Sequence, residues 1–94
     1  MSKNPVISVK VDGTKEWQVD GKSHRLDGPA IEYPDGSKIW CVDGKIHRLD
    51  GPAIEWNDGS KEWLIEDQEI SEDHFNHVKD LPIEEIRTIL AIVK

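Results

Sequence analysis

The sequence predicts an α+β fold, with a repetitive antiparallel meander of about six strands followed by two C-terminal helices. Residues 12–34 recur as residues 35–57 with 17 of 23 positions identical, and a third copy starts at Asp58. A fixed period of this length is typical of repeat arrays, in which each copy forms one supersecondary unit. The repeat ends near Asp67, and apolar residues then recur at helical spacing.

Length and composition indicate one small domain over 1–94, with the repeat sheet at 6–66 and the helical segment at 70–94. The net charge of −7 disfavours direct binding to nucleic acid or to an anionic membrane, because both need clustered basic side chains. Cys41 is the single cysteine, and no apolar run approaches the length of a membrane span. We therefore expect a cytoplasmic protein without an internal disulfide.

Strand-like segments alternate with turn signals through the repeats. The predicted strands are 6–11, 15–19, 30–33, 38–42 and 53–56, followed by the start of the third copy. Between the third and fourth of them, the PDGS segment at 34–37 suits a three-residue hairpin loop in which Gly36 takes positive φ. This loop sets Glu32 opposite Lys38, an opposite-charge pair that favours the register.

One tryptophan recurs in each copy, on one face of the predicted sheet. The three are Trp17, Trp40 and Trp63, and the small Ala30 and Ala53 lie opposite them. Large rings facing small side chains make a packing ladder. We therefore favour a structural role for these rings over stacking on a ligand.

The copies diverge on the other face of the sheet. Three positions that are polar in the first copy become apolar in the second, at Ile39, Cys41 and Ile46. We define the apolar patch as Ile39, Cys41 and Leu64, with Ile31 and Ile54 nearby. A patch of this kind on a polar face has to be covered.

Two helices are predicted after the repeats. Ser71 suits the N-cap of a helix over about 72–79, and Pro82 suits the first turn of a second helix. The second helix carries an apolar stripe of Ile83, Ile86, Ile89, Leu90 and Val93. Because an isolated helix of this length is marginal, we expect it to dock on the apolar patch. The alternative is the same helix from a second subunit, which would make a homodimer.

Two sets of repeat residues match the pattern W-x-x-x-G-K-x-H, then a glycine, a short strand and D-G. The first is Trp17, Gly21, Lys22, His24, Gly28, Asp35 and Gly36, and the second is Trp40, Gly44, Lys45, His47, Gly51, Asp58 and Gly59. The chain therefore resembles MORN repeat proteins over about 12–65, and more closely the MORN-like repeats of small phage and bacterial proteins. The resemblance implies stacked β-hairpins in a scaffold for protein interaction or lipid association, often dimeric and without chemistry of its own. The acidic charge of this chain disfavours the lipid option.

The repeated His-Arg segments are the main polar candidates for a ligand site. They contribute His24 and Arg25 in one copy and His47 and Arg48 in the next. Two arginines one repeat apart could hold a small anionic ligand such as a nucleotide. Identical residues in both copies instead favour a packing role, since a catalytic centre needs one asymmetric constellation. We expect no enzyme, no metal site and no cofactor.

These observations predict a protein-interaction module, of the kind that a phage-type inhibitor or adaptor uses against a host protein such as a defence effector. Its partner would meet the acidic surface or the repeat face. The candidate contact residues for a partner or a second subunit are Trp17, Trp40, Trp56, Trp63, Tyr33, Ile39, Ile46, Ile86 and Leu90. Binding of a small anionic ligand by the His-Arg segments is the alternative function.

Overall fold

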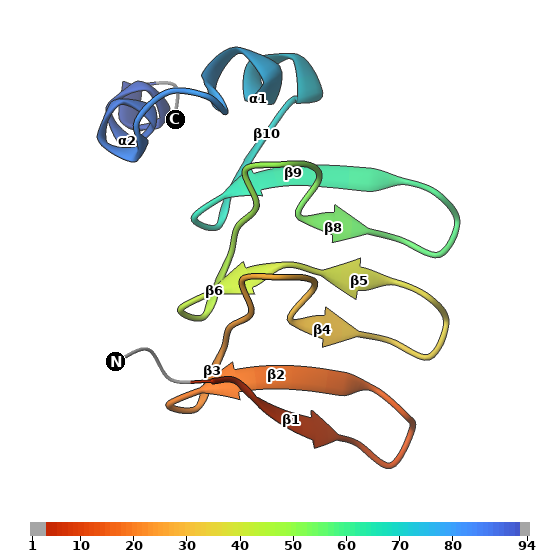
Figure 1. The fold of residues 1–94 in the computed structure, drawn as a ribbon. Coiled ribbons are helices and arrows are strands. Elements are labelled where there is room, and N and C mark those ends of the chain that lie inside the picture. Colours follow the sequence, from red (N-terminus) through yellow and green to blue (C-terminus); the bar gives the residue numbers. More distant parts are fainter. Residues whose placement is uncertain (1–3, 93–94) are drawn as a thin grey trace.

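The computed structural model describes residues 4–92 and confirms the α+β class, with a meandering antiparallel sheet and two C-terminal helices (Figure 1). The strands are β1 (Val6–Val9), β2 (Lys15–Val19), β3 (Lys22–Ser23), β4 (Ile31–Glu32), β5 (Lys38–Ile39), β6 (Cys41–Val42), β7 (Lys45–Ile46), β8 (Ile54–Glu55), β9 (Lys61–Ile65) and β10 (Gln68–Ile70). The helices are α1 (Glu72–Val78) and α2 (Ile83–Ile92). The main sheet has the order β1-β2-β4-β5-β8-β9-β10, so successive copies lie side by side in chain order.

The hairpins that join one copy to the next have the predicted register. Glu32 lies opposite Lys38 in the hairpin of β4 and β5, and Glu55 lies opposite Lys61 in that of β8 and β9. In the first of these loops Gly36 has the expected positive φ, at 95°. The hydrophobic pattern and the turn chemistry therefore agree in setting the pairing.

The meander also contains a second type of hairpin, which the prediction of about six strands lacks. β3, β7 and β10 return antiparallel from β2, β6 and β9. The turns of the first two are Asp20-Gly21 and Asp43-Gly44, and all four residues have positive φ. Such Asp-Gly pairs are typical of type I′ turns, whose twist suits a two-residue hairpin loop. The signal for these short strands was therefore present in the sequence.

Local signals predict both helices correctly. Ser71 caps α1, since its Oγ accepts a hydrogen bond from the His74 N–H at 3.1 Å. α2 begins directly after Pro82. Of the predicted stripe, Ile86 and Leu90 are buried, Ile83 and Ile89 are half-buried, and Val93 lies outside the described residues.

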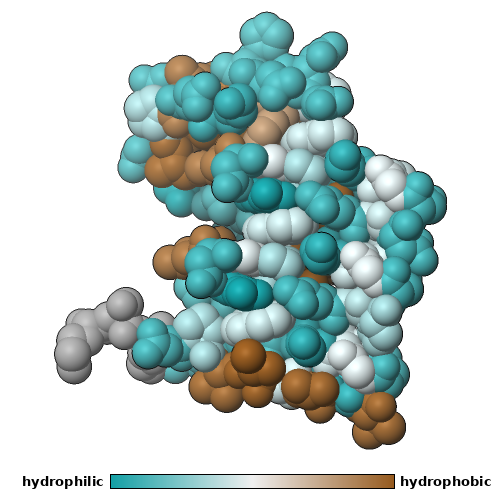
Figure 2. All heavy atoms as spheres, turned by 45° about the vertical axis from the view of Figure 1, so that its right-hand side comes forward, coloured by the Kyte–Doolittle hydropathy of each residue, from teal (hydrophilic) through white to brown (hydrophobic). Residues whose placement is uncertain are grey.

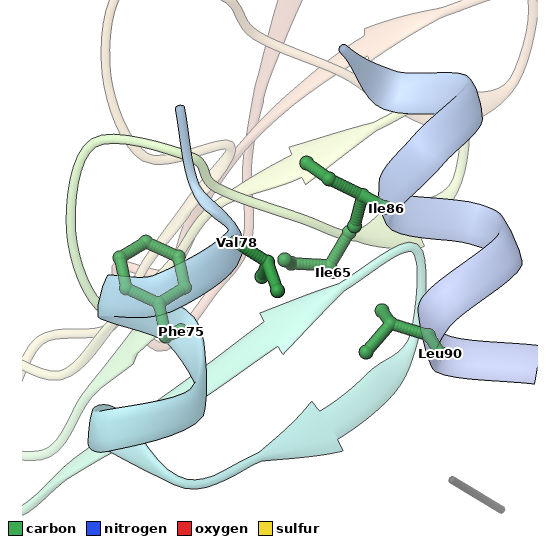
Figure 3. Close-up of a cluster of buried hydrophobic side chains, with 5 residues drawn as sticks. All are labelled: Ile65, Phe75, Val78, Ile86 and Leu90. Carbon is green, nitrogen blue, oxygen red and sulfur yellow. The ribbon is translucent and has the colours of Figure 1, made fainter. Parts of the chain in front are cut away.

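The helices pack at the C-terminal end of the array, at the opposite end of the molecule from β1 (Figure 1). Their buried side chains converge with that of β9 in one cluster, formed by Ile65, Phe75, Val78, Ile86 and Leu90 (Figure 3). Trp63 packs against the same cluster. The prediction that the helices cover the apolar patch is therefore wrong.

The apolar patch is buried by packing between neighbouring strands of the array. Its central members belong to a second cluster formed by Ala53, Ile54 and Leu64, with Ile39 and Ile46 packed against it. Side chains alternate along β9, so Trp63 and Ile65 project from the face opposite to Leu64. The helices cover the face that carries Trp63, whereas Leu64 on the other face packs beside Ile54 of the preceding copy.

Candidate functional site

The two His-Arg loops, residues 24–28 and 47–51, bring the main candidate residues together. In the second loop the Arg48 guanidinium lies 3.9 Å from the centre of the Trp40 ring. Its Nε donates to Asp50 Oδ1 at 2.8 Å, and its Nη1 donates to the Pro52 carbonyl at 3.0 Å and to Glu55 Oε2 at 3.2 Å. A cation–π stack and three hydrogen bonds therefore hold one arginine in place.

The first loop repeats this arrangement. Arg25 stacks on Trp17 at 4.0 Å and donates to Asp27, to the Pro29 carbonyl and to Glu32, at 3.0, 3.2 and 3.5 Å. Both guanidinium groups are thus occupied by their own copy, as the packing interpretation predicts. Sequence reasoning paired the repeat glutamates with lysines only and missed their contact with arginine, although the spacing between arginine and glutamate is the same in both copies.

A glycine in each loop leaves room for the arginine. A Cβ added at Gly51 would lie 2.9 Å from Arg48 Cζ, and one at Gly28 would lie 3.0 Å from Arg25 Cζ. The guanidinium is therefore sandwiched between an indole ring and the backbone. This geometry gives a physical reason for the repeated phrase R-L-D-G-P-A-I-E.

The third copy has a tryptophan without an arginine. The position one repeat period after Arg48 is Ser71, where α1 is capped. The helix therefore starts where a third His-Arg loop would begin, and Trp63 packs against the helical cluster instead of against a guanidinium. The helices act as the terminal cap that a repeat array requires.

The loop histidines link one copy to the next. His24 Nδ1 accepts a hydrogen bond from the Asp43 N–H, and His47 Nδ1 accepts one from the Glu66 N–H, each at 3.0 Å. The donors, Asp43 and Glu66, are each the first residue of the two-residue hairpin turn in the following copy, and both have positive φ. Among residues 4–92, no group of three or more metal-ligating side chains comes together. Their hydrogen bonds to the following copy give both histidines a structural role.

Burial lowers the pKa of His47 below its usual 6.5, and the nearby Glu66 carboxylate only partly opposes this shift. The unfolded chain therefore binds the proton more readily than the folded one. By linkage, the contribution of the neutral ring to stability is complete above about pH 6.5 and is lost as the pH falls through the folded-state pKa. Protonation at Nδ1 would also remove the acceptor that holds the next copy.

We expect the stability advantage of wild type over His47→Gln to shrink as the pH falls from about 7 to about 5. The glutamine variant does not titrate at this position, so the difference isolates this ring from the other histidines. Urea unfolding at several pH values measures it. The pKa of Glu66 is lowered by its hydrogen bond with Arg87, so that carboxylate affects stability only at lower pH. A difference that stays constant with pH would contradict the assignment.

Cys41 is buried inside the array, and burial raises the pKa of its thiol to about 11. The thiol is therefore neutral at physiological pH and behaves as a small apolar side chain. It pairs with Ile46 across the hairpin of β6 and β7. This environment does not suit a nucleophile.

The remaining candidate contact residues divide by exposure. Tyr33 and Trp56 are exposed at the hairpins, and Trp56 Nε1 donates to Glu62. Ile39 and Ile46 are half-buried against the second cluster. Ile86 and Leu90 are buried inside the helical cluster, where their apolar side chains cap the array. Their contact with a partner or second subunit stays a prediction.

A groove of about 650 Å³ runs between the two His-Arg loops. Its lining residues are Arg25, Leu26, Asp27, Gly28, Trp40, Val42, His47, Arg48, Leu49 and Asp50. Leu26 is 79% exposed. The side chains of Asp27 and Asp50 are each 86% exposed and carry negative charge to the surface here. The groove thus combines an apolar wall with solvent-exposed carboxylate oxygens.

The chain was compared with protein families, curated proteins and solved structures. No protein-family model, no curated protein and no solved structure matches this chain. Neither of the described helices has the length and apolar character needed to cross a bilayer.

Proposed function

We propose that this protein is a non-enzymatic interaction module that binds a protein partner in the groove between its His-Arg loops. The exposed Leu26 at this groove is the observation that supports it most directly, since a leucine with 79% exposure contributes little to the fold. Exposed apolar side chains rimmed by charged ones are typical of protein interaction sites. A role as an inhibitor or adaptor of a host protein is consistent with the resemblance to small phage and bacterial repeat proteins.

The exposed charge at the groove favours a basic partner, because the side chains of Arg25 and Arg48 are only 22% and 20% exposed. Asp27 and Asp50 each bond an arginine with one oxygen, and both side chains remain largely in solvent. The whole chain carries a net charge of −7. An apolar side chain flanked by lysine or arginine would therefore be steered towards this groove and packed within it.

The nucleotide alternative has less support. A phosphate needs donors that are free to reorient, and both guanidinium groups already donate to carboxylates and to a backbone carbonyl. The carboxylates at the groove would also repel an anion. We expect an unchanged melting temperature across a nucleotide panel, and a clear stabilisation by one nucleotide would favour this alternative over a protein partner.

We expect Leu26→Ser to abolish partner binding without changing the fold. The substitution removes exposed apolar surface only, so the melting temperature should stay within about 2 °C of wild type. Affinity capture with the intact chain identifies the partner, and calorimetry with the purified partner then measures the loss. Raising the salt concentration should also weaken binding, because exposed charges steer it.

Ile92→Ser is the matched control. Ile92 is 78% exposed, on the helix at the end of the array, and does not line the groove. This variant should bind like wild type. Equal binding by wild type and Leu26→Ser would show that the partner uses another surface.

A further inference from the structure

The N-terminal end of the array exposes an uncharged strand edge. All four residues of β1 are exposed, with Val6 at 70%, Ile7 at 52% and Val9 at 63%. They form an apolar surface at the end of the molecule remote from the helices (Figure 2). β1 pairs with β2 on one side, and no other described strand pairs with its outer edge. Such an edge is a ready template for another strand.

The backbone groups that face outward can be assigned from the pairing. Lys10 N–H donates to the Thr14 carbonyl across the turn, so Ser8 and Val6 also bond towards β2. The N–H and C=O groups of Ile7 and Val9 therefore point away from β2. Trp17, the cross-strand neighbour of Ile7, bonds to the following strand in the same alternation.

The outer edge of β1 corresponds to a strand edge that is paired in the later copies. Val9 lies one repeat period before Glu32, and in later copies this position pairs with a lysine of the preceding strand, as Glu32 with Lys15 and Glu55 with Lys38. In β1 the glutamate of the phrase is replaced by valine. β1 can therefore still pair through its backbone, but it lacks the negative charge that would favour a lysine opposite this position.

We propose that two copies of this chain pair through β1, antiparallel and about a two-fold axis at Ser8. In this register Ile7 of each copy lies opposite Val9 of the other copy. Each of these two pairs exchanges two backbone hydrogen bonds. Pro5 has no N–H to leave unpaired at the outer end of the ladder. The β-branched side chains meet as cross-strand pairs on one face.

The two ends of the array explain why a second copy is the occupant. α2 covers the opposite end, where Gln68 Nε2 of β10 donates to the Leu90 carbonyl and the helical cluster lies on β9. In a head-to-tail stack the helices would lie between the copies, whereas two β1 ends can meet directly (Figure 1). Pairing through an uncharged strand also keeps the acidic surfaces of two chains of charge −7 apart.

Disulfide trapping of Ser8→Cys tests the register. The two Ser8 positions form the non-hydrogen-bonded pair on the axis, where Cα atoms lie about 4.5 Å apart, within the range that a disulfide spans. We expect mild oxidation to convert this variant to a covalent dimer within the concentration range where wild type sediments as a dimer. The wild type itself should not crosslink, because Cys41 is buried. Ile92→Cys, an exposed thiol on α2 at the opposite end of the array from β1 (Figure 1), controls for random collision.

Val9→Glu tests the interface without a thiol. It restores the residue that the later copies carry at this position and places two carboxylates in the proposed ladder. We expect sedimentation to show self-association weakened by at least about tenfold, with an unchanged circular dichroism spectrum. A monomeric wild type, equal crosslinking of Ser8→Cys and Ile92→Cys, or a Val9→Glu variant that dimerises like wild type would overturn the proposal.

Discussion

Leu90→Asp is expected to unfold the helical cap and to lower the free energy of unfolding by about 4 kcal/mol or more. Leu90 is 4% exposed and packs in the cluster that joins α2 to α1 and β9 (Figure 3). The substitution removes a buried leucine and places a carboxylate in a cluster of apolar side chains. Small domains are stable by only about 5–15 kcal/mol, so most of that stability would be lost.

Far-UV circular dichroism and thermal unfolding measure this loss, and hydrogen exchange shows how far it spreads into the array. In a repeat protein each unit is stabilised by its neighbours, so β9 should lose protection before β2 does. Ile92→Asp is the matched control, because Ile92 lies on the same helix with 78% exposure. A Leu90→Asp variant that melts with wild type would contradict the capping role of α2.

Arg48→Ala is expected to destabilise the array by about 2–4 kcal/mol, without any change in binding of small anions. The variant loses the stack on Trp40 and the hydrogen bonds to the Pro52 carbonyl and Glu55. Asp50 contributes little to this sum, since its side chain is 86% exposed and regains water. Chemical unfolding of Arg48→Ala, of Trp40→Leu and of the double variant forms a double-mutant cycle. The cycle gives the coupling free energy between the ring and the guanidinium.

Arg87→Ala separates this effect from ordinary surface charge pairing. Arg87 makes a bidentate pair with Glu66 at 2.8 and 2.9 Å, but its side chain is 56% exposed and lies over no ring. Its removal should change stability far less than that of Arg48. If both variants lose the same stability, the packing of the guanidinium between the indole ring and the backbone does not stabilise the His-Arg loops.

Much of the fold follows from local signals in the sequence. The repeat period sets the order of strands, and the Asp-Gly turns and Glu32–Lys38 pairing set their register. Ser71 and Pro82 mark the starts of the two helices, and α1 ends one residue before its predicted limit at 79. These features are local because turn geometry, capping and strand alternation involve residues close together in the chain.

The candidate site was less predictable. The sequence identified His24, Arg25, His47 and Arg48, and indicated that their repetition favours packing. It did not show that each arginine lies between a tryptophan and a glycine, or that each histidine accepts from the next copy. The histidine contacts join residues that belong to different copies, and only the stacking of those copies decides them.

The sequence by itself determined the repeat, the strand register and the existence of two helices, because each depends on short-range patterns. Tertiary structure decided which surface the helices bury. Both faces of β9 offered apolar residues, and the position of Ser71, one period after Arg48, places α1 over Trp63 instead of over Leu64. Leu64 already packs beside Ile54 of the preceding copy, so steric packing leaves the helices the open end of the array.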